Sequence, residues 1–325
     1  MSNSKRRAAF RAIWNPDMYH GWKKKRSFFE GWYIKLVDRT GKRSIAFIPG
    51  ISMDANGSQI AFLQIMDGTK SQSHFFEFPA DQFVPDSQRF QIRLGENTFS
   101  DREITLNTAD WKGHITFDNP VRWPSKRLSP GVMGWYSFVP FMQCYHGVVS
   151  MDHSLKGNIR IAGEEVDFTG GRGYIEKDWG RSFPRAWVWM QTNHFPKMDG
   201  TSVMFSIAHI PWLGSYFIGF LCGIYVNGTL HIFTTYNRSS ARLKILDHGV
   251  LVEIKKGIKL LHLEIHQAPG ADLRSPISGA MLGKVNESMQ ASVDVKLQDG
   301  SSVIFQGRGE HAGFEMAGDV DVLLE

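Results

Sequence analysis

The sequence has 325 residues, of which 42% are hydrophobic and 13% are aromatic. A chain of this length and apolar content can bury a substantial core, so the composition excludes an intrinsically disordered protein. The two cysteines, Cys144 and Cys222, exclude a disulfide-rich scaffold and a cysteine-based metal cluster. The net charge of +5 is small for this length and excludes a protein that is basic over its whole surface.

Basic residues gather near the N-terminus, beside a predicted short helix at residues 4–13. They are Lys5, Arg6, Arg7, Arg11, Lys23, Lys24, Lys25 and Arg26. Three interpretations of a basic arm over residues 1–24 remain open: a solvated arm, contact with an anionic membrane surface, and binding of nucleic acid. The rest of the chain carries no basic stripe and no nucleic-acid-reading motif, so we expect no nucleic-acid partner. Peripheral membrane contact stays open, since each cation near such a surface contributes about 1 kcal/mol.

The N-terminal charges are not followed by the apolar segment of a signal peptide. Together with the low cysteine count, this pattern predicts a reducing, cytoplasmic location, with the membrane periphery as the alternative.

Short runs of β-forming residues alternate with turn dipeptides along the whole chain. The clearest strands are predicted at residues 43–52, 59–66, 89–94, 187–195, 202–210, 261–266 and 302–307. The turns include Thr40-Gly41, Asn56-Gly57, Asp67-Gly68, Asp199-Gly200, Asn227-Gly228 and Asp299-Gly300. No stretch sustains a long helical period, so the spacing predicts an all-β sandwich or barrel.

The two halves of the chain are similar around "FFEGWY" at residues 28–33 and "YIEKDWG" at residues 174–180. Each phrase precedes a strand, a glycine-containing turn and a phenylalanine-rich strand, and Phe47 and Phe205 occupy equivalent places. This similarity predicts a tandem duplication of two antiparallel β-barrels of about 150 residues each, packed together. The glycines of residues 167–174 place the boundary between a domain at 25–168 and a domain at 169–325.

An acidic group lies among aromatic residues at positions 174–179, "YIEKDW". In an extended strand Tyr174, Glu176 and Asp178 share one face, and Lys177 and Trp179 share the other. Two carboxyls on one dry face repel each other, which raises one pKa and makes a neutral general acid. The alternative is a solvated strand face.

The following strand carries aromatic and amide side chains on one face. These are Trp187, Trp189, Gln191 and Asn193. Such a face is typical of a strand that lines a ligand cavity in a barrel, although two tryptophans can also simply fill a small barrel.

Two further segments require interpretation. Residues 210–226 carry no charge, but the Asn227-Gly228 hairpin signal that follows favours two buried strands over a transmembrane helix. His262, Glu264 and His266 share a strand face and are metal-ligand types. These three residues lie roughly 6.5–7 Å apart along one strand, which is too far for ordinary rotamers to meet at one ion. The spacing therefore favours a solvated face, and we expect no metal site.

Three segments together resemble the tocopherol cyclase family. They are "FFEGWY" at 28–33, "YIEKDWGRSFPRAWVWMQTNHF" at 174–195 and "LRSPISGAMLGKVNESMQASVDVKL" at 273–297. The resemblance implies double lipocalin-like barrels, distantly related to hydratases and cyclases of that fold. It also implies ring closure on a prenylated quinol without a cofactor. Asp178 stands where the plant pattern has Asn.

That chemistry requires a desolvated acid, electron-rich walls for a carbocation, and exclusion of water. We expect Asp178 or Glu176 to be the acid and Glu30 to be its partner or a second acid. The predicted substrate-binding residues are Trp32, Tyr33, Tyr174, Trp179, Trp187, Trp189, Gln191 and Asn193. His194 is a weaker candidate for a proton shuttle. A lipocalin-type carrier of a hydrophobic ligand, an isoprenoid hydratase and a purely structural protein are the alternatives.

Overall fold

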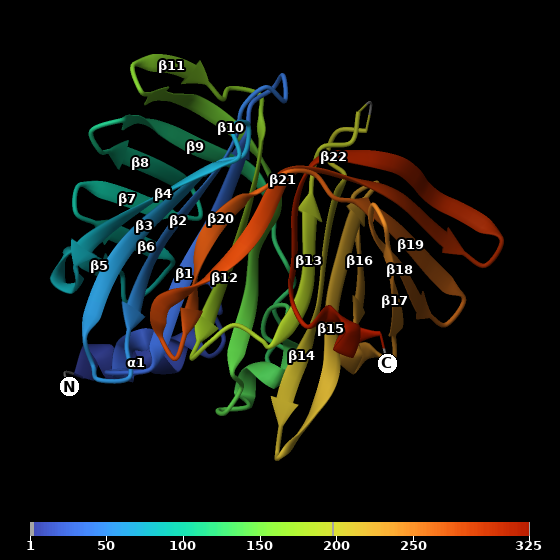
Figure 1. The fold of residues 1–325 in the computed structure, drawn as a ribbon, viewed down its shortest axis with the longest axis horizontal. Coiled ribbons are helices and arrows are strands. Elements are labelled where there is room, and N and C mark those ends of the chain that lie inside the picture. The colour runs from blue at the N-terminus through green and yellow to red at the C-terminus, as the bar shows by residue number, and fades with distance from the viewer. Residues whose placement is uncertain (1–2, 197, 325) are drawn as a thin grey trace. The chain divides into compact units, whose positions relative to one another are not determined.

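The fold is all-β and contains two lipocalin-like antiparallel β-barrels, as the sequence predicts (Figure 1). The computed structural model describes residues 3–196 and 198–324. The helical elements are α1 (Asn3–Ala12) and the 3-10 turns η1 (Gly21–Lys23), η2 (Ala80–Gln82), η3 (Gly134–Phe138), η4 (Thr235–Asn237) and η5 (Val320–Leu323). Helix α1 confirms the short helix predicted at the N-terminus.

The first sheet curls into a nearly closed barrel, with strands in the order β4-β3-β2-β1-β12-β10-β9-β8-β7-β6-β5 and β11 beside β10. Its strands are β1 (Phe28–Val37), β2 (Ser44–Met53), β3 (Gln59–Asp67), β4 (Gln72–Pro79), β5 (Phe83–Pro85), β6 (Gln91–Leu94), β7 (Asn97–Ser100), β8 (Glu103–Asn107), β9 (Trp111–Val121), β10 (Cys144–Ile161), β11 (Glu164–Asp167) and β12 (Arg172–Gly180).

The second sheet has the order β16-β15-β14-β13-β22-β21-β19-β18-β17, with β20 beside β21. Its strands are β13 (Ala186–Thr192), β14 (Ser202–Trp212), β15 (Ser215–Val226), β16 (Thr229–Thr234), β17 (Ser240–Leu246), β18 (Gly249–Lys256), β19 (Lys259–His266), β20 (Ala271–Ile277), β21 (Ala280–Asp299) and β22 (Ser302–Gly318).

The strand orders of the two sheets correspond. Each sheet has a four-stranded meander, β1 to β4 or β13 to β16, whose first strand pairs with the last strand of its sheet, β12 or β22. Phe47 on β2 and Phe205 on β14 are both fully buried in their cores. The correspondence agrees with the predicted duplication.

The boundary between the two compact units differs from the predicted one. The first unit comprises Met1–Asp67, Ser73–Phe183 and Leu273–Lys284, and the second comprises Gly68–Gln72, Pro184–Asp272 and Val285–Glu325. The segment "YIEKDWG" is therefore β12, the strand that closes the first sheet against β1, and not the start of the second domain. The glycines before it form a turn, in which the Gly171 amide donates to the Phe168 carbonyl.

Each unit has its own hydrophobic core, built from alternate residues of its strands. The first core contains Trp32, Ile175 and Trp179, and the second contains Val188 and Met190. Residues 210–226 form the end of β14 and all of β15, which confirms strands there. Among the described residues, no helix is both long enough and apolar enough to cross a membrane.

Candidate active site

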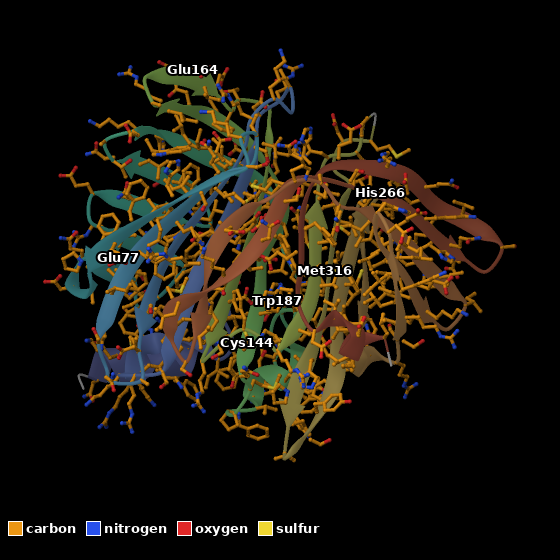
Figure 2. All side chains as sticks on the ribbon, viewed as in Figure 1. Glu77, Cys144, Glu164, Trp187, His266 and Met316 are labelled. Carbon is orange, nitrogen blue, oxygen red and sulfur yellow. The ribbon has the colours of Figure 1, made fainter. Side chains whose placement is uncertain are left out.

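Three neighbouring strands of the first sheet, β1, β12 and β10, carry two groups of ionisable side chains on opposite faces. Along this platform Gly31, Asp178 and His146 lie in one cross-strand row. The next row contains Trp32, Lys177 and Gly147. Because successive side chains of a strand point to opposite faces, the two rows project in opposite directions. Strands β10 and β11 form a hairpin, and Figure 2 labels Cys144 at the start of β10 and Glu164 at the start of β11, at opposite ends of this hairpin.

The face toward the barrel core carries the inner cluster, which we define as His20, Glu30 and Lys177. The Lys177 ammonium forms an ion pair with Glu30 Oε1, and both side chains are completely buried. The same ammonium donates to the Met18 carbonyl over 2.6 Å. It also lies 4.3 Å from the ring centroid of Trp32, a distance at which a cation is attracted to the indole face.

The segment after α1 supplies hydrogen-bond donors to Glu30. The backbone N–H of His20 lies 3.0 and 2.9 Å from the two carboxylate oxygens, and that of Gly21 donates to Oε2 over 3.1 Å. Burial alone would raise the pKa of Glu30, but the charge of Lys177 and the hydrogen bonds from the His20 and Lys177 side chains outweigh it and lower the pKa. Glu30 is therefore held as a carboxylate, and this environment opposes its predicted role as a second acid.

Trp179 lies between two aromatic rings beside the inner cluster. Its ring stacks on His20 at a centroid distance of 4.2 Å and on Tyr145 at 5.3 Å, with near-parallel planes in both pairs. The Trp32 indole N–H donates to the Asp17 carbonyl over 3.0 Å and its ring stacks on Phe90. These contacts tie the N-terminal segment to one end of the barrel, so both tryptophans have a structural role in the described contacts.

The opposite face carries the outer cluster, which we define as Tyr174, Glu176, Asp178 and His146. The Tyr174 hydroxyl donates to Glu176 Oε2 over 2.5 Å. His146 lies between the carboxylates, with Nδ1 2.9 Å from Asp178 Oδ1 and Nε2 3.4 Å from Glu176 Oε2. The alternation predicted for residues 174–178 is confirmed, and the shared face is the one that points away from the core of the first barrel.

His146 carries a positive charge between the two carboxyls of the outer cluster. Burial alone would lower the pKa of His146, but the two carboxylates outweigh it and raise the pKa to about 10. Near neutral pH the imidazole is therefore a cation between two acidic side chains. The side chain of Glu176 is 7% exposed and that of Asp178 is 28% exposed, so Asp178 is the more accessible carboxyl.

Tyr33 belongs to the same face as the outer cluster, since it lies opposite Glu176 in the register of β1 and β12. The predicted aromatic residues of the first unit are thus divided. Tyr33 and Tyr174 lie with the acids, whereas Trp32 and Trp179 lie in the core beside Glu30.

The remaining predicted residues belong to the second unit. The core-facing residues of β13 are Val188 and Met190, so Trp187, Trp189 and Gln191 project from the other face. The expectation that these side chains line the interior of a barrel is therefore wrong. The indole N–H of Trp187 donates to Glu315 Oε2 over 2.7 Å, and Figure 2 labels Trp187 and Met316 on the paired strands β13 and β22. Their binding of a substrate stays a prediction.

Past the end of β13, Asn193 is buried beside His194. Its Oδ1 lies 2.9 Å from His194 Nδ1, and the His194 ring makes an edge contact with His311. A role of His194 as a proton shuttle stays a prediction.

Among the residues that the structure describes, two groups of side chains have ligand atoms within 4.8 Å of one another, close enough to bind one cation. One is His146, Glu176 and Asp178, and the other is His248, Glu264 and His266. The second group replaces His262 of the predicted trio with His248, because His262 Nδ1 pairs with Glu253 at 3.3 Å. A carboxylate-rich set such as the first suits hard cations, and a two-histidine set suits zinc or copper.

Sequence reasoning missed His146, His20 and the pairing of Lys177 with Glu30. His146 is 32 residues from Asp178, and the Lys177–Glu30 contact spans 147 residues. Only the pairing of β1, β12 and β10 brings these groups together. The available signal was the alternation in "CYHGVV" at residues 144–149, which places His146 on the face opposite Tyr145.

Comparison with known proteins assigns the chain to a family. Residues 98–318 match the family described as tocopherol cyclase-like. A chloroplastic tocopherol cyclase of Zea mays is 37% identical over 76 residues, and a probable chloroplastic tocopherol cyclase of Oryza sativa subsp. japonica is 27% identical over 161 residues. These matches cover 23% and 46% of this chain but only 16% and 33% of the plant proteins. The chain thus spans a third or less of the length of these relatives.

Solved structures share the fold. CghA with Sch210972 superimposes with a TM-score of 0.57 at 11% identity, covering 90% of this chain and 89% of CghA. A putative AttH from Nitrosomonas europaea gives a TM-score of 0.53 at 16% identity, covering 89% and 92% of the two chains. At these identities the likeness concerns the fold alone, and the family assignment rests on the match over residues 98–318.

Proposed function

This chain belongs to the tocopherol cyclase-like family, and on that premise we propose that it closes a ring on a prenylated quinol or a related isoprenoid by acid catalysis. The observation that carries the proposal is the outer cluster, in which an imidazolium lies between two carboxyls on a face that the barrel core does not use. Clusters of coupled ionisable groups with a strongly shifted pKa are typical of sites that transfer protons.

The reaction is an isomerisation, so its atoms balance without a redox partner. A proton from the acid adds to the less substituted carbon of a trisubstituted alkene and leaves a tertiary carbocation. The phenol oxygen attacks the cation, a carbon–oxygen bond forms, and the phenolic proton returns to the protein. Prepositioning the phenol replaces a bimolecular encounter.

We assign the acid to Asp178 in the first place, since it is the more exposed of the two carboxyls. His146 acts as a positioning residue that fixes Asp178 through the 2.9 Å contact and relays protons between the carboxyls. Glu176, which accepts from Tyr174, is the second candidate for the acid. Tyr33 and Tyr174 supply aromatic surface on the same face, where electron-rich rings favour a cation.

The capture step distinguishes a cyclase from a hydratase. If the site excludes water, the phenol oxygen captures the cation and the product is a ring; if water enters, the product is a tertiary alcohol. Both products begin with the same protonation, so the outer cluster serves either reaction.

The experiment that tests the proposal is incubation of the purified chain with a panel of prenylated quinols in deuterated water, followed by mass spectrometry. We expect a ring-closed product with one deuterium bound to carbon. The double variant Glu176→Gln/Asp178→Asn serves as the inactive control. Tight binding of the quinols without any product in the wild-type chain would contradict the proposal and identify a carrier. A deuterated tertiary alcohol as the product would instead identify the activity as that of a hydratase.

A further inference from the structure

Two segments of the first unit combine exposed rings with positive charge and contain no acidic residue. They are residues 3–16, with α1, and residues 124–141, with η3. Their cations are Lys5, Arg6, Arg7, Arg11, Lys126 and Arg127, and all six are exposed. Figure 2 shows nitrogen-tipped side chains projecting from the region of α1 at the lower left of the view.

The same two segments expose large apolar side chains. These are Phe10, Leu128, Trp135, Phe138 and Phe141, which are between 41% and 79% exposed. Single exposed apolar residues are ordinary on protein surfaces, but five of them in two adjoining segments form a patch of the kind that marks an interaction surface.

Direct contacts join the two segments into one surface. The Phe10 and Trp14 rings lie 4.9 Å apart, and the Trp14 and Phe138 rings lie 6.0 Å apart. The Trp14 indole N–H donates to the Arg127 carbonyl over 3.0 Å. Trp14 is therefore the link between α1 and the segment with η3.

The surface of α1 is hollowed at this point. A depression of about 550 Å³ is lined by Arg6, Arg7, Phe10, Arg11, Trp14 and Asn15. The guanidinium groups of this lining offer bidentate donors to phosphate oxygens, and its aromatic rings offer apolar surface to a hydrocarbon chain.

We propose that this surface, residues 3–16 and 124–141, docks the protein onto an anionic lipid bilayer. Charge complementarity decides the occupant, because the surface is purely cationic and acidic headgroups attract such clusters. The exposed tryptophan and phenylalanines match the interfacial zone of a bilayer, where aromatic rings are enriched. The inference requires no assumption about the reaction, although a membrane is where a prenylated substrate would be met.

The test is co-sedimentation of the full chain with vesicles of phosphatidylcholine alone and of phosphatidylcholine with phosphatidylglycerol. We expect binding to the anionic vesicles only, and weaker binding as the ionic strength rises. The variant Arg6→Gln/Arg7→Gln should lower the partition coefficient roughly 25-fold, at about fivefold per charge. Its matched control is Lys112→Gln/Lys156→Gln, which removes two exposed cations from β9 and β10 and should change binding less than about twofold.

Leu128→Gln tests the apolar part independently of α1, because Leu128 is 79% exposed and its replacement leaves the core untouched. Its control is Leu282→Gln, which is equally exposed on β21. We expect weaker vesicle binding for the first variant alone, with unchanged thermal unfolding of both. Failure of the wild-type chain to bind anionic vesicles, or equal losses in the variants and their controls, would overturn the proposal.

Discussion

The two faces of β12 bury similar residue types but arrange their charges differently. On the inner face Glu30 is matched by the Lys177 ammonium and by backbone donors. On the outer face two carboxyls share one imidazolium. The inner carboxylate accepts from several donors at once, whereas the outer carboxyls flank an imidazolium whose pKa they raise to about 10. Burial alone therefore does not distinguish a structural acid from a candidate catalytic one, and the two faces differ in the partners that surround their acids.

The largest expected effect comes from breaking the inner pair. Lys177→Met leaves the Glu30 carboxylate buried without its counter-charge, which should lower the free energy of unfolding by about 3–5 kcal/mol. Denaturant unfolding measures it. The double variant Lys177→Met/Glu30→Gln should recover part of the loss, and a loss below about 1 kcal/mol in the single variant would show that the pair is not structural.

The outer cluster should make the free energy of unfolding decrease as the pH rises above neutrality. His146 has a folded-state pKa of about 10, above the ordinary value of 6.5, so its contribution is complete below pH 6.5 and is lost as the pH rises toward 10. The slope should reach at most about 1.4 kcal/mol per pH unit. Denaturant unfolding between pH 6.5 and 10 should show this slope in the wild type and not in His146→Gln; identical profiles would contradict the ion pairs described.

A second histidine of β10 sharpens the comparison because it responds in the opposite direction. His153 is fully buried against Gly173 and Phe117, and burial lowers its pKa to about 3. The contribution of His153 to the free energy of unfolding is therefore complete above pH 6.5. It is lost as the pH falls toward 3, again at no more than about 1.4 kcal/mol per pH unit. The free energy of unfolding of His153→Gln should not show this loss between pH 6.5 and 3. The same acid dependence in the variant and the wild type would be inconsistent with a neutral buried imidazole.

The smallest effects should come from glycines on the two faces. A Cβ on Gly147 would lie 3.1 Å from Lys177 Cγ and 3.3 Å from Trp179. Both neighbours are held by other contacts, so Gly147→Ala should lower the free energy of unfolding by about 1–2 kcal/mol. A Cβ on Gly31 would meet its neighbours at 3.6 Å or more, so Gly31→Ala should be neutral within about 0.5 kcal/mol. Thermal melts of both variants measure the contrast, and equal shifts would refute it.

Local pattern predicted much of the fold. The alternation of residues 174–178, the Asn227-Gly228 hairpin with positive φ at both residues, and the strands at 43–52 and 202–210 follow from side-chain period and turn chemistry. Such signals depend on residues close in sequence.

What the sequence could not predict depends on strand pairing. The glycines at 170–173 resembled a domain boundary, yet Gly170 and Gly171 lie in the turn before β12, and Gly173 is already part of β12, which pairs with β1. Likewise the face of β13 with Trp187, Trp189 and Gln191 was expected to line a barrel, but the core of the second unit takes the opposite face. Alternation separates two faces and does not say which one is inside.

The measurement that tests the central claim most directly is the ring-closure rate of Asp178→Asn and Glu176→Gln, with Glu164→Gln on β11 as the exposed control. The account predicts a loss of roughly 10²- to 10⁴-fold in kcat for the variant that removes the acid, Asp178→Asn in the first place, and no change for Glu164→Gln. Unchanged turnover in both outer-cluster variants, with their folding intact, would contradict the assignment of catalysis to this face of β12.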